Sequence, residues 1–300
     1  MNNIGAVAAL ATAVSWTITA LAFEYAGKRI GAFALNFLRL AVGFVLLGLW
    51  CLVTQGSFLP LSAPPSAWFW LSASGVVGLV IGDLLLFQAF IDIGSRISML
   101  IYASAPALTA VLGFGILGER LAGLALLGMA LTLSGIAFVV LGKGEDAETR
   151  HSKSRAIKMR GYLCAAGGAL GQAGGLILSK IGAGSMDPFA GTEIRVTAGL
   201  VGFALVLLVA RAWKGTWSAL KDRRALASLG LGSFFGPFLG VSLSLLAVQS
   251  TEAGVAAAIM SIIPVLIIAP SALLYKEKVK AREILGSLVA VGGVFILFMS

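Results

Sequence analysis

Long apolar runs alternate with short polar segments along almost the whole chain. Each run has about 20 residues, which is enough for an α-helix to cross the hydrocarbon core of a bilayer. Strands of a membrane barrel would be shorter and would alternate apolar with polar positions, so helices are expected. The pattern predicts an all-α polytopic membrane protein with ten transmembrane helices, at residues 3–26, 32–54, 67–91, 95–118, 121–142, 159–181, 188–211, 225–249, 253–275 and 281–299.

Polar segments mark the organisation of the chain, and a short turn is expected at residues 92–96, between the third and fourth helices. Residues 143–158, KGEDAETRHSKSRAIK, form the one strongly polar stretch, and they separate a first half at 1–142 from a second half at 159–300. Asp187-Pro188 combines a helix-capping residue with a proline suited to the first helical position, so the seventh helix is expected to begin there. No basic leader precedes the first apolar run, which we therefore interpret as a structural helix and not as a signal peptide.

The second half of the chain repeats the first. An offset of 158 residues aligns Pro106 with Pro264, Glu119 with Glu277, Gly128 with Gly286, and Gly135 with Gly293. Nearer the start of each half, an offset of 156 residues aligns Gly5 with Gly161, Trp16 with Gln172, Arg39 with Arg195, and Gly43 with Gly199. Because each half has five predicted helices, an odd number, the second half must enter the membrane upside down. Two inverted five-helix repeats are a common plan of secondary transporters.

Composition and charge agree with a membrane location. Hydrophobic residues make up 59% of the chain and charged residues only 12%, about half the charged share of a soluble protein. The net charge of +9 comes from basic residues in loops, so it indicates topology and does not indicate nucleic-acid binding. The loops after the first, third, fifth, seventh and ninth helices hold nearly all of them: Lys28, Arg29, Arg96, the 143–158 linker, Arg211, Lys214, Lys221, Arg223, Arg224, Lys276, Lys278, Lys280 and Arg282.

Orientation follows from this asymmetry, because basic loops stay in the cytoplasm. The linker is predicted to be cytoplasmic and both termini to lie outside the cell. The chain offers no metal site or cofactor site. Cys51 and Cys164 lie in apolar runs that do not correspond under the repeat, and His151, the only histidine, lies in the linker. Both cysteines are interpreted as small buried apolar residues.

Asp83 is the strongest candidate for a functional ionisable residue within the membrane. It lies about eight residues from the cytoplasmic end of its helix, roughly 12 Å deep at 1.5 Å per residue. A carboxylate at that depth needs a partner, water or a proton. Arg39, at a similar depth on the second helix, could form a fixed ion pair with it. Alternatively, Asp83 could be a protonatable carboxylate that faces a cavity and couples transport to protons.

Two further ion pairs are predicted from the inverted repeat. Arg195 and Glu119 should both lie near the outer surface, and Arg39 and Glu277 should both lie on the cytoplasmic side. Each pair could be a structural lock, or a gate that breaks when the opposite pair forms. Glu193 and Arg195 are two positions apart and point to different faces of their helix, so they are not expected to pair with each other.

Midplane residues are the candidates for substrate contact. Trp16 and Gln172 are equivalent under the repeat and fall near the middle of the first and sixth helices. Phe87 lies one turn from Asp83. For each of these residues, packing is the alternative role.

Two prolines are expected to kink their helices, because proline removes an internal hydrogen bond. Pro106 and Pro264 are equivalent, and the carbonyls freed one turn earlier belong to Tyr102 and Met260. Glycine stripes at Gly78-xxx-Gly82 and in the eighth helix predict close helix packing, either static or as a sliding surface.

Together these residues resemble the EamA-type drug/metabolite transporter superfamily. The resemblance rests on Arg39, on Pro106 followed by Gly118-Glu119-Arg120, and on the glycines of the fifth helix. The second half is a weaker copy, with Lys276-Glu277-Lys278 in place of Gly-Glu-Arg. The match covers nearly the whole chain as two EamA-like units.

The resemblance implies a ten-helix carrier of the inner membrane that moves amino acids, other metabolites or organic cations by alternating access, often as an exporter. It also implies a central cavity lined by Trp16, Asp83, Phe87, Tyr102, Gln172 and Met260. Because two units are fused, a functional monomer is expected, with a small-molecule substrate and the lipid bilayer as its partners and no cofactor.

Other classes of membrane protein fit less well. An intramembrane aspartyl protease needs two aspartates, and the predicted helices supply only Asp83. A serine hydrolase needs a histidine in the membrane, and none is there. The chain is therefore not expected to be an enzyme. A channel, a sensor or a scaffold without carrier activity is the alternative to a carrier.

Overall fold

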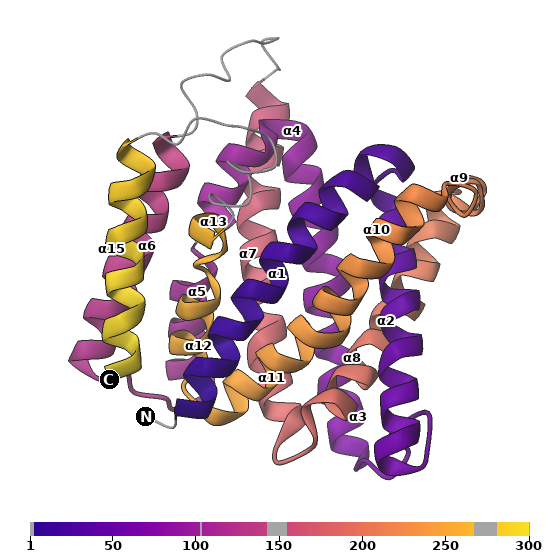
Figure 1. The fold of residues 1–300 in the computed structure, drawn as a ribbon, viewed down its shortest axis with the longest axis horizontal. Coiled ribbons are helices and arrows are strands. Elements are labelled where there is room, and N and C mark those ends of the chain that lie inside the picture. The colour runs from indigo at the N-terminus through magenta and orange to yellow at the C-terminus, as the bar shows by residue number, and fades with distance from the viewer. Residues whose placement is uncertain (1–2, 103, 143–154, 267–280, 300) are drawn as a thin grey trace.

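The computed structural model describes residues 3–102, 104–142, 155–266 and 281–299 (Figure 1). Its ordered elements within these ranges are helices, without strands. Those of the first half are α1 (Asn3–Ile30), α2 (Ala32–Gln55), α3 (Pro65–Ser74), η1 (Gly75–Gly82), α4 (Asp83–Tyr102), α5 (Ala105–Leu112), η2 (Gly113–Leu117) and α6 (Gly123–Gly142). Those of the second half are α7 (Arg155–Ala183), α8 (Pro188–Val209), α9 (Trp213–Ala219), α10 (Arg223–Ser233), η3 (Phe234–Gly240), α11 (Val241–Ser250), α12 (Ala253–Met260), α13 (Ile263–Leu266) and α15 (Ala281–Met299).

Six helical stretches are long and apolar enough to cross a membrane: Ile4–Gly27, Ala32–Gln55, Pro65–Leu86, Arg155–Ala183, Pro188–Val209 and Arg223–Ser250. Three shorter apolar helices are Ala105–Leu117, Gly123–Phe138 and Ile284–Met299. The chain is thus a multi-pass membrane protein. The ninth predicted span, 253–275, lies partly outside the described residues.

The two ends of the bundle differ in which helices begin and end there. Figure 1 shows α1 beginning and α15 ending at the same end, which we call the terminal end. At the opposite end, which we call the linker end, α6 ends and α7 begins. Asp187 caps α8 at the terminal end as expected, because its Oδ1 accepts a hydrogen bond from the backbone N–H of Ala190 at 2.9 Å.

Two local predictions were wrong. Residues 92–96, expected as a turn between helices, lie within α4. They contain no proline and one glycine, so helical hydrogen bonding can continue through them, and Asp92 is held there by Arg160. The loop expected after the seventh span contains the short helix α9, in which Trp213 and Trp217 stack with ring centroids 6.1 Å apart.

Wide helical turns occur at equivalent places in the two halves. The π-helical segments η1 and η3 end at Gly82 and Gly240, which the 158-residue offset aligns. Pro237 lies inside η3 and has no N–H to donate to the preceding turn, which favours the wider turn there. Such segments often occur at functional sites in helices.

Contacts between the halves are also repeated. A methyl group at Gly5 would lie 3.0 Å from Thr251 Cβ, and the residue equivalent to Thr251 is Ile93, which packs against Gly161. Pro237 packs against Gly43, and the equivalent contact joins Leu79 to Gly199. At these two places, helices of one half therefore meet the other half through equivalent residues.

Helices α6 and α15 show the same exchange in their own contact. They lie side by side in Figure 1. Gly128 packs against Gly293, while Gly135 packs against Gly286, so the equivalent residues swap partners. As the number rises along α6, the partner's number falls along α15, so the two helices run antiparallel. Cβ atoms at Gly128, Gly135 and Gly293 would collide with backbone of the facing helix, which explains why these residues are glycines.

Candidate functional site

Trp16 and Gln172 face the interior of the bundle. Each follows a strongly exposed apolar residue by two positions: Val14 is 47% exposed and Leu170 is 51% exposed. Two positions turn an α-helix by about 200°, so Trp16 and Gln172 point away from the lipid-facing side. Both are half-buried. The Trp16 indole lies over Gly240, where a methyl group would sit 3.2 Å from Nε1.

Asp83 is the first residue of α4. It also points inward, because Ile81, two positions before it, is 46% exposed. The structure brings Asp83 together with Arg39, whose Nη2 donates a hydrogen bond to Asp83 Oδ2. The Asp83 side chain is 20% exposed and the Arg39 side chain is 8% exposed. The guanidinium also lies 5.9 Å from the ring centroid of Phe23. Tyr102 lies close enough to interact electrostatically with both Asp83 and Arg39.

Helix breaks lie beside the two candidate prolines. Helix α4 ends at Tyr102 and α5, which contains Pro106, begins at Ala105. In the second half, α12 ends at Met260 and α13, which contains Pro264, begins at Ile263, so the two breaks are equivalent. Tyr102 and Met260 are both half-buried at these breaks. The side chains of Phe87 and Pro264 lie outside what the structure describes.

The predicted pair of Arg195 and Glu119 was wrong for this structure. Glu119 Oε1 instead lies 2.5 Å from Lys180 Nζ, and Glu119 Oε2 accepts a hydrogen bond from the N–H of Ala253 at 2.9 Å. Lys180 Nζ also donates to the carbonyl of Thr251 at 2.5 Å. We call these four residues, Glu119, Lys180, Thr251 and Ala253, the outer network. Glu277, the predicted partner of Arg39, lies outside the described residues.

The outer network ties three parts of the bundle together at its terminal end. Glu119 follows η2 after Gly118, which adopts the left-handed backbone conformation (φ 68°) that turns the chain back. Lys180 lies in the last turn of α7, and Thr251 and Ala253 lie where α11 gives way to α12. Sequence reasoning missed Lys180 because a lysine near a helix end reads as one that reaches into the headgroup region.

Arg195 has no such partner. Its Nε and Nη1 atoms, and the Oγ1 of Thr192 on the preceding turn, have no hydrogen-bond partner in the described part of the chain. Thr192 is fully buried and Arg195 is 5% exposed. Glu193 is also fully buried, and neither of its carboxylate oxygens has a hydrogen-bond partner among the described residues.

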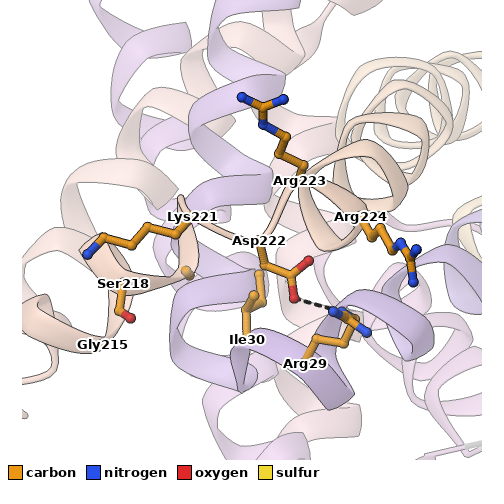
Figure 2. Close-up of a pocket in the computed structure, with 9 residues that line it drawn as sticks. Arg29, Ile30, Gly215, Ser218, Lys221, Asp222, Arg223 and Arg224 are labelled. Carbon is orange, nitrogen blue, oxygen red and sulfur yellow. Dashed lines mark hydrogen bonds and ion pairs between the residues drawn. The ribbon is translucent and has the colours of Figure 1, made fainter.

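Ion pairs also hold the linker end. Arg160 binds Asp92 through both Nε and Nη2, at 2.7 and 2.8 Å, and so joins α7 to α4. Arg29 Nε donates to Asp222 Oδ2 at 2.7 Å and joins α1 to the start of α10 (Figure 2). The Arg29 guanidinium, helped by the N–H of Ala225, holds the pKa of the Asp222 carboxyl below its usual value.

The groove around Asp222 is a basic surface and not a converging site. Figure 2 shows the side chains of Lys221, Arg223 and Arg224 pointing in three different directions away from Asp222. None of the described parts of the chain brings three metal-ligating side chains together. The candidate site is therefore the interior set of Trp16, Asp83, Tyr102, Gln172 and Met260.

Comparison with protein families decides the class. The model of the EamA-like transporter family matches residues 3–141 and, a second time, residues 159–299. The chain belongs to this family. Members of the EamA-like family are membrane transporters and not enzymes, and the two matches correspond to the two structural repeats described above.

Comparison with solved structures supports the fold of this EamA-like chain. The crystal structure of one protein superposes on it with a TM-score of 0.77, over 99% of this chain and 96% of that chain. The two sequences are 18% identical, so the likeness concerns the fold alone. A comparison with curated proteins found no match.

Proposed function

We propose that this EamA-like protein is a secondary carrier that moves a small polar or amphipathic metabolite across the plasma (inner) membrane by alternating access. The carrier works as a monomer of ten transmembrane helices in two inverted repeats, and it acts as an exporter. The supporting observation is the set of inward-facing, half-buried side chains of Trp16, Asp83 and Gln172 in the middle of a membrane bundle.

The antiparallel contact of α6 with α15 supports the inverted arrangement. Two equivalent helices that touch across a twofold axis normal to the membrane would run parallel. An axis in the membrane plane makes them antiparallel, as the exchanged contacts of Gly128 with Gly293 and of Gly135 with Gly286 require. A fused pair of repeats contains this contact within one chain, which is why a monomer suffices.

The outer network supports alternating access. The positive-inside rule favours a cytoplasmic linker end, and in this proposal the terminal end faces outward. There, Glu119 and Lys180 join η2 of the first half to α7 and the α11–α12 junction of the second half. Closing this end while the other end opens requires the network to form, and releasing a substrate outward requires it to break. In this proposal the Asp83–Arg39 pair is structural and holds α4 against α2.

Counterflow in proteoliposomes tests the carrier directly. A thermal-shift screen of the purified protein against a metabolite panel first identifies a compound that raises its melting temperature. Vesicles loaded with that compound should then accumulate the labelled compound against its gradient, because a carrier exchanges substrate across the membrane. A channel, a sensor or a scaffold would produce no such accumulation, and that result would refute the proposal.

Trp16→Ala is the variant that tests the site. Because the indole lies on an inward face and is only half-buried, its removal should lower counterflow about tenfold or more while leaving the melting temperature nearly unchanged. Val14→Ala, on the lipid-facing side of the same helix, is the matched control and should transport normally. Trp16→Ala that mainly lowers the melting temperature would assign Trp16 to packing.

A further inference from the structure

Thr192 and Arg195 form a buried polar pair on α8. They are three positions apart, so their side chains project from the same face of the helix. Thr192 Oγ1 and Arg195 Nε and Nη1 all lack a hydrogen-bond partner within the described residues, although both residues are buried. Buried charges are normally paired and buried polar atoms normally hydrogen-bonded, so this arrangement calls for a missing partner.

The repeat identifies what is missing. Asn36 and Arg39 occupy the equivalent positions on α2, and there Arg39 is bound to the carboxylate of Asp83. The residue equivalent to Asp83 in the second half is Val241. The packing of α2 on the other half is matched by that of α8, as the exchanged contacts of Gly43 and Gly199 record. The second half thus keeps the cation of this arrangement and lacks the carboxylate.

Glu193 is not the missing carboxylate partner of Arg195. It lies two positions before Arg195, about 200° around the helix, so its carboxylate points to another side of α8. The outer network does not supply the carboxylate either, because Glu119 is bound to Lys180 and Ala253.

We propose that Arg195 and Thr192 bind a carboxylate group of the transported metabolite. This inference rests on the carrier function proposed above and narrows its substrate class to carboxylate-bearing compounds, as opposed to organic cations. A guanidinium presents parallel N–H donors that match the two oxygens of a carboxylate, and a threonine hydroxyl can donate a further hydrogen bond. One bound carboxylate carries the single negative charge that neutralises one buried guanidinium.

The position of the site fits a substrate within the membrane. Arg195 lies seven residues after Pro188, the first residue of α8, and therefore about 10 Å inward from the terminal end at 1.5 Å per residue. A doubly charged phosphate would leave one negative charge without a partner there. The same guanidinium could hold chloride or inorganic phosphate, and the experiment separates those anions from a carboxylate.

The experiment is a thermal-shift titration of the purified protein with a panel of amino acids and organic acids. Each compound is paired with its neutral amide, and organic cations, chloride and inorganic phosphate complete the panel. At least one carboxylate should raise the melting temperature while its amide does not. Arg195→Met should weaken that compound's binding about tenfold or more, because hydrogen bonds to a charged group are lost, and Thr192→Val should weaken it by a smaller factor.

Controls separate binding from folding. Arg195→Met should keep or raise the melting temperature of the unliganded protein, since it removes an unpaired buried charge. Arg195→Lys keeps the charge but lacks the parallel N–H donors of the guanidinium, so it should bind the carboxylate with intermediate affinity. Arg120→Met replaces an exposed arginine next to the outer network and should leave binding within about twofold of wild type.

Three results would overturn the inference. They are a panel in which no carboxylate acts differently from its amide, equal stabilisation by chloride or phosphate alone, and carboxylate binding that survives Arg195→Met unchanged. Failure of this inference is distinct from failure of the proposed function. If an organic cation or a neutral compound shows counterflow, the protein is a carrier and the assignment of Arg195 is wrong. If carboxylate binding depends on Arg195 but no compound shows counterflow, the site stands and the carrier does not.

Discussion

Arg39 and Arg195 occupy equivalent places in the two halves of the chain, yet the described residues supply a carboxylate only for Arg39. The surrounding packing is the same in both halves, because Gly43 and Gly199 meet the opposite half through equivalent contacts. The carboxylate is missing in the second half because Val241 occupies the position equivalent to Asp83. Under the two proposals above, the repeated scaffold carries one arginine as a structural partner and the other as a binding group.

The two ends of the bundle differ in a similar way. At the terminal end, Glu119 faces Lys180 at 2.5 Å. The positions equivalent to these in the sequence are Glu277 and Glu24, two acids in place of an acid and a base. The two halves therefore carry different charges at these equivalent positions of the sequence.

The largest expected effect separates the two arginines. Arg39→Met leaves the Asp83 carboxylate without its cation, and breaking a buried pair from one side costs about 3–5 kcal/mol. The free energy of unfolding in detergent should fall accordingly. Arg39→Met combined with Asp83→Val, the residue type found at Val241, should recover most of the loss. Arg195→Met should show no such fall.

Asp83→Asn sharpens the same comparison. Because it leaves the Arg39 guanidinium unpaired, the variant should be less stable than wild type and should express poorly. A stable Asp83→Asn protein that exchanges substrate normally but has lost the pH dependence of net transport would contradict the structural role. That outcome would indicate that Asp83 couples transport to protons.

A smaller effect is expected at the outer network. Lys180→Met removes the partner of Glu119 and the hydrogen bond to the Thr251 carbonyl. Losing hydrogen bonds to a charged group should weaken closure by about 2 kcal/mol. A cysteine introduced at Trp16 should then react faster with a thiol reagent applied from outside. Lys180→Arg keeps a cation that can donate to both Glu119 and the Thr251 carbonyl and should keep labelling slow. Unchanged labelling in Lys180→Met would contradict a closing role.

The smallest effect concerns the Arg29–Asp222 pair at the linker end. Since the pKa of Asp222 is lowered in the folded protein, the pair adds stability above the ordinary carboxyl pKa of 3.8, and this contribution is lost as the pH falls through the lowered value. Acid unfolding curves of Asp222→Asn and wild type should therefore differ at neutral pH and converge in acid. Curves that differ by the same amount at every pH would show that the ion pair does not contribute.

Much of the fold could be predicted because membrane-spanning helices are recognisable as long apolar runs in the sequence. The apolar runs predicted α1, α2, α7 and α8 nearly to their ends, and the Pro106–Pro264 equivalence anticipated breaks beside both prolines. The turn at 92–96 was misplaced, since nothing in Asp92-Ile93-Gly94-Ser95-Arg96 marks whether helical hydrogen bonding continues or stops. Helix α9 was missed because seven residues in a basic loop carry little periodic signal.

The candidate site was harder to predict than the fold. Depth along a helix can be counted from the sequence, so Arg39 and Asp83 could be matched as neighbours. Which helices touch in the membrane plane cannot be counted in that way, and Glu119 was therefore assigned to Arg195 when Lys180 lies next to it. The absence of an acid at Val241 was visible in the sequence, but its meaning depends on knowing that Arg195 is buried without a partner.

Cross-linking of the outer network tests alternating access most directly. In a protein with Cys51 and Cys164 replaced by alanine, Glu119→Cys and Ala253→Cys place two thiols where Glu119 Oε2 accepts from the Ala253 N–H at 2.9 Å. A short bis-methanethiosulfonate reagent joins them and locks the terminal end. We predict that counterflow in proteoliposomes stops after cross-linking and returns when a reductant releases the link. Counterflow that continues at the full rate in the cross-linked protein would contradict the account.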